Sequence, residues 1–246
     1  FHSFVGCASE SIAFSMTGAE YVREIGAGEI VFFSGDGSRP SVARFDGAAE
    51  LFRSGDGLAQ CIFEHVYFAR PGSMVFGDSV YRVRLEMGRR LAREHPADCD
   101  VVVPVPDSGM FAAIGYSRES GVDLDMGFTR NHYVGRTFID PTQAARQSMV
   151  MRKIQPIPSA VAGKRVCVVE DSIVRGTTSI TRIKALREAG AREVHMRVSC
   201  PPHRHACYFG IDFPQQDKLI AHDRSVTEVA RILGLDSLAY LSVEGM

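Results

Sequence analysis

Residues 166–179 read Val-Cys-Val-Val-Glu-Asp-Ser-Ile-Val-Arg-Gly-Thr-Thr-Ser. The apolar run 166–169 predicts a buried strand, because parallel strands covered on both faces lose the polar alternation of half-exposed strands. Two carboxylates, Glu170 and Asp171, follow this strand, and a turn with Gly176 and three hydroxyls leads into a helical pattern. Backbone N–H groups of such a turn attract phosphate, and the carboxylates can meet sugar hydroxyls or a metal ion. Acidic residues at a strand end are often only solvated, but the attached Thr-Thr-Ser turn favours a site for a phosphorylated sugar.

A second loop of the same kind follows an earlier apolar strand, in the sequence Val-Pro-Val-Pro-Asp-Ser-Gly at 103–109. Gly109 permits close backbone approach, Ser108 offers a hydroxyl, and the next helix presents its N-terminus. Taken alone, this is also ordinary turn chemistry. If the strands ending at Pro104 and Glu170 are neighbours, the two loops face one crevice with the carboxylates between them.

The chain from residue 61 onward alternates strand and helix patterns, which predicts an α/β fold with a mainly parallel, twisted sheet flanked by helices. The arginines of the first long helix are expected to form its solvated face. Ligands of such sheets bind at the carboxyl ends of the strands. We expect strands over 100–105, 123–129, 164–169, 193–199 and 237–241, and helices over 77–94, 109–119, 178–189 and 225–233.

Residues 1–52 have a different pattern, with short strands expected over 4–9, 29–34 and 41–45 between Gly-rich turns. Such a meander needs a partner sheet to cover it, so we interpret it as a piece of a larger domain. The polar stretch 53–58 is the expected boundary. The predicted domains are therefore 1–52 and 53–246.

Residues 130–153 combine five cationic side chains with a single acid, and Gly135 and Pro141 argue against continuous regular structure. Long loops of compact domains are often active-site lids, and a cationic lid beside two anion-binding loops would close over a polyphosphate. A solvated basic loop and a nucleic-acid arm are the competing interpretations. The cations are Arg130, Arg136, Arg146, Arg152 and Lys153.

The composition is that of an ordinary globular protein, with 246 residues, 45% hydrophobic and 23% charged. The net charge of −1 gives no argument for nucleic acid or a membrane as partner. No apolar run approaches the roughly 20 residues that cross a bilayer, and the start lacks a secretory pattern. Six scattered cysteines without Cys-x-x-Cys spacing make a disulfide framework improbable, and Cys99 and Cys167 are expected in buried strands. We expect a cytoplasmic protein.

Residues 169–178 match the phosphoribosyl-pyrophosphate (PRPP) motif of the type I phosphoribosyltransferases. Five further stretches narrow the resemblance to the amidophosphoribosyltransferase family, over nearly the whole chain. They are 61–71, 133–139, 201–202, 209–212 and 241–245.

The resemblance implies an enzyme of the first step of purine biosynthesis. In that family an N-terminal-nucleophile (Ntn) glutaminase domain releases ammonia from glutamine, and a transferase domain combines it with PRPP to give 5-phosphoribosylamine and pyrophosphate. Residues 1–52 resemble the C-terminal part of the glutaminase domain; position 1 is Phe where the family has its catalytic Cys, so the chain as numbered should lack glutamine hydrolysis. The resemblance also implies purine nucleotides as feedback inhibitors and a homo-oligomer, with neither nucleic acid nor a membrane as partner.

Roles follow from the resemblance where residues match the motif. The 172–178 loop would hold the 5′-phosphate, the 107–109 loop the pyrophosphate, and 130–136 would belong to the closing loop. The implied catalytic residues are Glu170, Asp171 and Arg136; the implied PRPP-binding residues are Asp107, Ser108, Gly109, Arg130, Ser172, Ile173, Val174, Arg175, Gly176, Thr177 and Thr178; and the implied Mg²⁺ ligands are Ser108, Glu170 and Asp171.

The chain departs from the family pattern at three places. Glu170 stands where the family usually has aspartate, and the loop reads Arg-Asn-His-Tyr at 130–133 where Lys-Asn-Arg-Tyr is usual. One branch of the family binds a [4Fe–4S] cluster, and Cys61 and Cys207 fall on two of its four cysteine positions. The alternative is that both are buried thiols. The run His-Arg-His at 203–205 beside Cys207 gives only weak support for zinc, because further spaced ligands are missing.

Two rival functions remain open. A nucleobase phosphoribosyltransferase would need an aromatic residue stacking on the base. A PRPP-sensing regulator would keep the fold and add a DNA-binding segment, and none is visible in the sequence.

Overall fold

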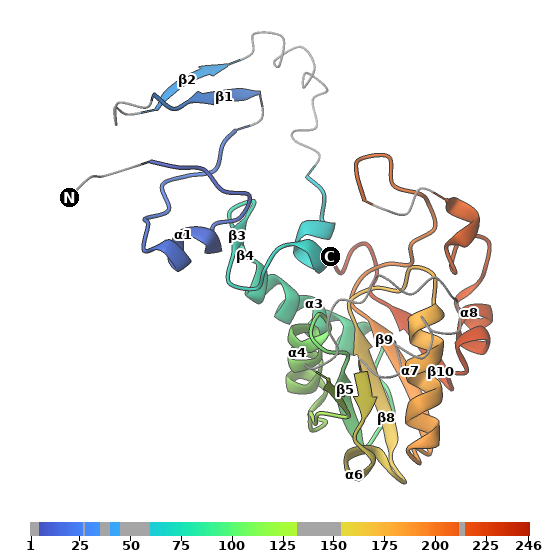
Figure 1. Cartoon of the computed structure of the whole chain (residues 1–246). Helices are drawn as coiled ribbons and strands as arrows, with labels where there is room; N and C mark the ends of the chain where they lie inside the picture. The colour runs from blue at the N-terminus through green and yellow to red at the C-terminus, as the bar shows by residue number, and fades with distance from the viewer. Residues whose placement is uncertain (1–4, 27, 35–39, 45–59, 132–153, 212–214) are drawn as a thin grey trace. The chain divides into compact units, whose positions relative to one another are not determined.

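The computed structural model describes residues 5–26, 28–34, 40–44, 60–131, 154–211 and 215–246 (Figure 1). The chain divides into two compact units, residues 1–80 and 81–246. The boundary expected at 53–58 lies outside the described residues, so the predicted domain limits stay a prediction.

The first unit is built from short elements, α1 (Ile12–Thr17), the hairpin β1–β2, a π-helical turn and the hairpin β3–β4. Strands β1 and β2 confirm the strands expected over 29–34 and 41–45, and they pair antiparallel. The strand expected at 4–9 is wrong, because residues 5–9 are not in a strand and α1 follows soon after. The elements after α1 are β1 (Glu29–Phe32), β2 (Ser41–Arg44), the turn η1 (Glu64–Phe68), β3 (Met74–Val75) and β4 (Asp78–Ser79).

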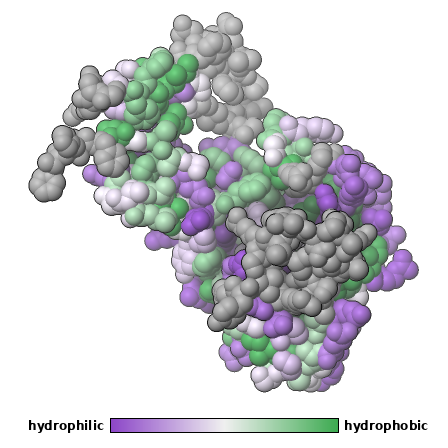
Figure 2. Space-filling model, viewed as in Figure 1, coloured by the Kyte–Doolittle hydropathy of each residue, from purple (hydrophilic) through white to green (hydrophobic). Residues whose placement is uncertain are grey.

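Apolar side chains on the first hairpin are exposed. Ile30 and Phe32 alternate along β1 and are each about half exposed, as is Val42 on β2. Figure 2 shows hydrophobic residues gathered over these strands. A two-stranded hairpin is marginally stable by itself, so this surface agrees with the expectation that the meander needs a covering partner.

The second unit contains a four-stranded parallel sheet in the order β10-β9-β8-β5. Helix α4 packs against β5 and β8, whereas α7 packs against β9 and α8 against β10 (Figure 1). This confirms the α/β class and four of the five expected strands. The elements are α3 (Val80–Glu94), β5 (Val101–Pro104), α4 (Met110–Ser120), β8 (Arg165–Glu170), α7 (Thr177–Glu188), β9 (Glu193–Val198), α8 (Val226–Leu233) and β10 (Ser237–Tyr240).

The strand expected at 123–129 does not form as one element, and of these residues only 128 and 129 lie in a strand. Only Leu124 makes an isolated parallel bridge, to Val102, after which the chain leaves the main sheet. Residues 128–130 form β6 (Phe128–Arg130), which pairs antiparallel with β7 (Ile154–Pro156). The apolar pattern therefore covers two pieces of chain with different partners, and a sequence pattern does not show which partner a strand takes. The short helices α6 (Pro158–Val161) and η2 (Gln216–Lys218) were not expected.

The core of the second unit explains why these elements form. The four residues 166–169 of β8 are all buried, as their unbroken apolar run predicts. Helix α8 begins at a capping box, in which Ser225 accepts from the Glu228 backbone N–H and the Glu228 carboxylate accepts from Ser225. The arginines of α3 were expected to be solvated, but Arg84 is only 5% exposed. Arg84 shares one helical face with Val80, Met87 and Leu91, which are among the buried residues of α3.

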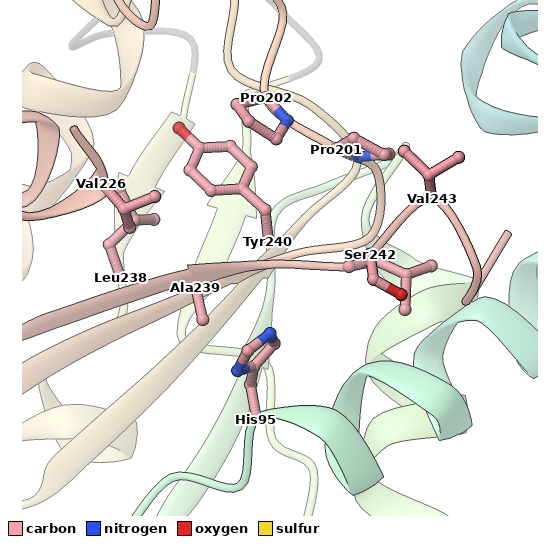
Figure 3. A pocket seen from close by; sticks show the side chains of 10 residues that line it. His95, Pro201, Pro202, Val226, Leu238, Ala239, Tyr240, Ser242 and Val243 are labelled. Atoms are coloured by element: carbon pink, nitrogen blue, oxygen red, sulfur yellow. The ribbon is translucent and has the colours of Figure 1, made fainter. Parts of the chain in front are cut away.

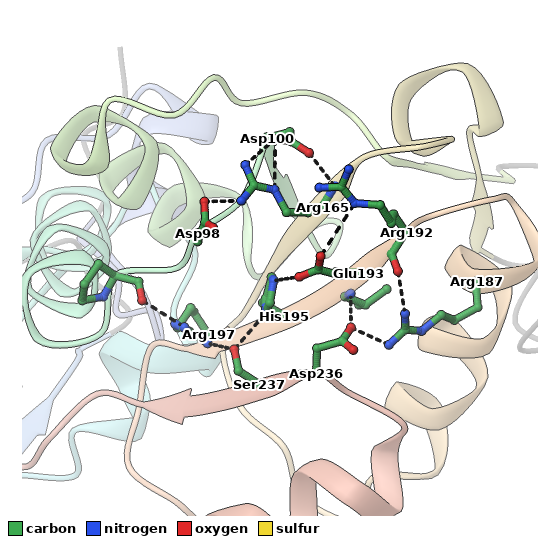
Figure 4. Close-up of polar contacts among 12 residues, drawn as sticks. Asp98, Asp100, Arg165, Arg187, Arg192, Glu193, His195, Arg197, Asp236 and Ser237 are labelled. Atoms are coloured by element: carbon green, nitrogen blue, oxygen red, sulfur yellow. Dashed lines mark hydrogen bonds and ion pairs between the residues drawn. The ribbon is translucent and has the colours of Figure 1, made fainter.

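Charged residues at the amino ends of the strands form a polar network (Figure 4). Asp100 accepts from the backbone N–H of Arg165 at 2.8 Å and from its guanidinium at 2.7 Å. Arg165 also pairs with Asp98. These contacts join β8 to the start of β5 across the amino edge of the sheet.

We expect the Asp100–Arg165 contact to make stability depend on acid pH. Hydrogen bonds from Arg165 lower the pKa of Asp100 to about 2. Because the folded-state pKa is depressed, the contribution is complete above the unfolded pKa of about 4 and is lost as pH falls towards 2. In urea unfolding, Asp100→Asn should be less stable than wild type at pH 7, and the difference should vanish near pH 2. The exposed Asp217→Asn is the matched control, and an equal difference at both pH values would contradict the assignment.

Candidate functional site

The two predicted binding loops leave neighbouring strands at the same edge of the sheet. Strands β5 and β8 pair in parallel register, with Pro104 opposite Val169. One residue further, the backbone N–H of Val105 donates to the carbonyl of Val169 at 2.9 Å. The two strands are therefore neighbours, which is what the two loops need in order to face one crevice.

The first loop, residues 105–109, turns directly into helix α4. Gly109 is the N-cap of α4, and its N–H donates to the carbonyl of Val105 at 2.9 Å. A Cβ atom on Gly109 would lie 2.4 Å from the carbonyl oxygen of Val169, so a side chain here would separate the two loops. The peptide bond between Pro106 and Asp107 is cis.

The second loop, residues 171–176, turns into helix α7 at Gly176. Gly176 has φ +76°, a left-handed conformation that glycine adopts without strain. A Cβ atom here would also lie 2.4 Å from the Cδ1 of Ile220. The helix starts at Thr177, so the loop delivers the exposed hydroxyls of Thr177 and Thr178 to its N-terminus. This is the arrangement that attracts a phosphate.

The two carboxylates at the end of β8 turn to different neighbours. Glu170 is paired with Arg182 of helix α7, with 2.6 Å between Oε2 and the guanidinium nitrogen. Asp171 accepts from the hydroxyl of Ser172 at 2.5 Å, and it interacts with Ser108 of the first loop, which lowers the pKa of Asp171. Asp171 therefore links the two loops, whereas Glu170 is tied to a helix.

Both carboxylates are buried, and each residue is only 4% exposed. Burial raises the pKa of Glu170, the charge of Asp171 adds to this effect, and Arg182 opposes it. Burial likewise raises the pKa of Asp171, against the hydrogen bonds from Ser108 and Ser172. The guanidinium charges of Arg182 and Arg84 also act against it. Two buried carboxylates so close together make a site that favours a bound cation.

The oxygen donors at this point fit Mg²⁺. The ion prefers hard oxygen ligands and is usually held by one or two carboxylates together with substrate oxygens and water. Glu170, Asp171 and the Ser108 hydroxyl supply such donors. The described part of the chain contains no group of three or more His, Cys, Asp or Glu side chains placed for a metal, so substrate oxygens would have to complete the coordination.

Sequence reasoning missed two cations beside the acid pair, Arg84 and Arg182. The spacing of the buried positions of α3 could have found Arg84, because it falls on the apolar stripe. Arg182 lies three residues after the buried Ser179 and one before the buried Ile183, so the helical period also places it on the inner side of α7. In each case a charged residue at an apolar position was the available signal.

The remaining predicted residues have varied surroundings. Arg130 lies in β6 and pairs with Asp107 of the first loop. Ile173 is 2% exposed, so it can offer a ligand only backbone groups, and the carbonyl of Val174 accepts from Ile220 at 2.9 Å. Arg175 is exposed. Arg136 and the rest of the proposed lid, 132–153, lie outside the described residues.

The cysteines differ in how far they are exposed to solvent. Cys61, in the first unit, is exposed, so the alternative that it is a buried thiol is wrong; Cys207, in the second unit, is half-buried. Cys99 and Cys167 are buried as expected. Cys200 lies 3.7 Å from the Nε2 of His203, but no third ligand joins them in the described ranges, so zinc gains no support.

A pocket of about 470 Å³ lies elsewhere, around the carboxyl end of the edge strand β10 (Figure 3). The side chains of Tyr240 and His95 lie on opposite sides of this strand. Neither Glu170 nor Asp171 lines the pocket, which is mainly apolar and therefore does not suit a phosphorylated sugar.

Two curated relatives and one solved structure show what this chain is similar to. The chain is 50% identical over 239 residues to the amidophosphoribosyltransferase of Methanothermobacter thermautotrophicus and 47% identical over 239 residues to that of Synechococcus elongatus; each alignment covers 97% of the chain and 48% and 47% of the relatives. The solved glutamine PRPP amidotransferase from B. subtilis, complexed with ADP and GMP, superposes with TM-score 0.83 and 43% identity. That match covers 96% of this chain and 50% of the other. No family model matches the chain.

The parallel sheet, its flanking helices and the two loops at one edge define a protein of the type I phosphoribosyltransferase fold. The sequence identities are more specific. Over 97% of its length the chain is similar to amidophosphoribosyltransferases, at 47–50% identity to the two relatives named above. It spans about half the length of the curated relatives it matches. Within the residues that the structure describes, no helix is both long and apolar enough to cross a membrane.

Proposed function

We propose that this chain provides the PRPP site of an amidophosphoribosyltransferase, which joins ammonia to PRPP and releases pyrophosphate in the first step of purine biosynthesis. One observation supports this above all. The 105–109 and 171–176 loops leave adjacent parallel strands, and Asp171 of the second loop interacts with Ser108 of the first. A sugar with phosphate groups at both ends matches two anion-binding loops separated by a carboxylate.

Each part of the site has a proposed task. The backbone N–H groups of 172–178 and the N-terminus of α7 hold the 5′-phosphate, and the 107–109 loop holds the pyrophosphate. Asp171 orients the ribose hydroxyls and stabilises the positive charge that builds on the ribose as pyrophosphate leaves. Free ammonia needs no strong base, so positioning and charge stabilisation supply the catalysis. Mg²⁺, which Asp171, Glu170 and Ser108 would hold, supplies neutralisation of the pyrophosphate charge.

The wider biology of the protein is part of the same proposal. Residues 1–52 are assigned to the end of a glutaminase domain, with glutamine as the source of ammonia. Purine nucleotides are proposed as inhibitors, and the B. subtilis relative was solved with ADP and GMP. A cytoplasmic homo-oligomer and a [4Fe–4S] cluster held in part by Cys61 and Cys207 are proposed from the family resemblance alone.

The proposal is tested by mixing the full-length protein with PRPP, Mg²⁺ and ammonium at alkaline pH and measuring pyrophosphate. We expect release that requires all three components. Release that requires adenine or guanine instead of ammonium would identify a nucleobase phosphoribosyltransferase. Binding of PRPP without any turnover, together with PRPP-dependent binding of DNA, would identify a regulator.

A further inference from the structure

The acid pair is asymmetric, and the cause is one side chain of helix α7. Successive residues at the end of a strand point to opposite faces of the sheet. Cys167 interacts with Tyr116 of α4 on one face, and Glu170, three residues later, reaches Arg182 of α7 on the other. Asp171 instead interacts with the first loop through Ser108. The two carboxylates therefore have separate partners.

The ion pair between Glu170 and Arg182 is well buried. The side chains are 5% and 17% exposed, and 2.6 Å separates their charged atoms. The pair is nevertheless incomplete, because Arg182 Nε is buried and has no hydrogen-bond partner within the described ranges. Buried ion pairs often contribute little net stability, and an unsatisfied donor makes this one weaker still. Stability alone is therefore a poor reason for Arg182 at this position.

Balancing the negative charge of Glu170 is a better explanation for an arginine at position 182. Two uncompensated carboxylates side by side would repel each other and an anionic ligand. Arg182 balances Glu170, so that the negative charge next to the first loop is that of Asp171. The side chain of Glu170 is one methylene group longer than that of Asp171, which lets its carboxylate extend to the guanidinium of Arg182 on the helix.

We propose that Arg182 is a positioning residue, which holds the Glu170 carboxylate against helix α7 so that Asp171 alone is presented to the phosphorylated sugar. The inference rests on the proposed function and makes it more specific, because Glu170 and Asp171 contribute unequally to binding the phosphorylated sugar. It also revises the expectation that both carboxylates contact the ligand, and with it the part of the proposed function in which Glu170 helps to hold Mg²⁺.

The test is a double-substitution cycle with Glu170→Gln and Arg182→Leu. The single Arg182→Leu variant leaves a buried carboxylate unpaired, and we expect a KM for PRPP raised about tenfold. Adding Glu170→Gln removes the charge that needed balancing, so the double variant should reverse most of that increase. Glu170→Gln alone keeps an oxygen acceptor for Arg182 and should raise KM for PRPP less than Asp171→Asn does. The control is Lys184→Leu, which removes a cation from the exposed side of α7.

A measurement without ligand accompanies the kinetics. The melting temperature of the free protein should fall most in Arg182→Leu and recover in part in the double variant. If Arg182→Leu does not fold, the double variant still decides the question through its KM for PRPP. The role of Arg182 would be overturned if the KM for PRPP stayed raised in the double variant. It would also be overturned if Glu170→Gln raised the KM for PRPP as much as Asp171→Asn does. An inactive wild-type protein would instead refute the proposed function.

Discussion

Replacing Asp171 with asparagine is expected to lower kcat/KM for PRPP by about 100-fold, because a charge that stabilises the reacting sugar is removed. The amide keeps an oxygen that can accept from Ser172 and interact with Ser108, so the geometry of both loops should persist. Steady-state kinetics with PRPP and ammonium provide the measurement.

The same variant should unfold at a higher urea concentration than wild type at pH 7. Burial raises the pKa of Asp171, so the buried carboxylate costs stability above its unfolded pKa, and a neutral amide removes that cost. Lower activity with undiminished stability would separate function from folding. The control is the exposed Asp123→Asn, and comparable activity in the two variants would contradict the role of Asp171.

A methyl group at Gly109 is expected to raise the KM for PRPP by about 100-fold, since displacing a binding group by about 1 Å has effects of this size. In Gly109→Ala the Cβ would lie 2.4 Å from the carbonyl oxygen of Val169, which belongs to the neighbouring strand. A backbone oxygen at the end of a hydrogen-bonded strand cannot yield as a flexible side chain does. The first loop must therefore move away from the second.

The control for this variant is Gly121→Ala at the other end of the same helix. Gly121 has φ +72° and no atom within 4 Å of its would-be Cβ, so the substitution introduces backbone strain without a collision. It should lower the melting temperature and leave the KM for PRPP unchanged. If both variants lose only stability, the contact between the loops has no role in binding.

Much of the second unit could be predicted because its signals are local. The unbroken apolar run at 166–169 identified a covered strand, and the glycines after the strands identified tight turns. The prediction at 123–129 failed for a non-local reason: Leu124 and Phe128 take partners from different sheets. The arginine at 84 was misjudged because charge was given more weight than helical position.

In the site, too, the features that depend on neighbouring residues could be predicted, and the contacts between distant residues could not. Residue types and spacing predicted two anion-binding loops and the acids beside one of them, because these features depend on neighbouring residues in the chain. Spacing could not show that Asp171 interacts with Ser108, about sixty positions away. It also could not show that Glu170 is held by Arg182 or that both carboxylates are buried.

Strand, turn and helix, and hence the chemical character of each loop, followed from the sequence itself, because backbone conformation and hydrogen-bonding capacity are properties of short segments. The pairing of β5 with β8, the closeness of Gly109 to Val169 and the partners of each carboxylate were decided only by the tertiary structure. Packing brings together groups far apart in sequence, and burial then determines which charges need a partner.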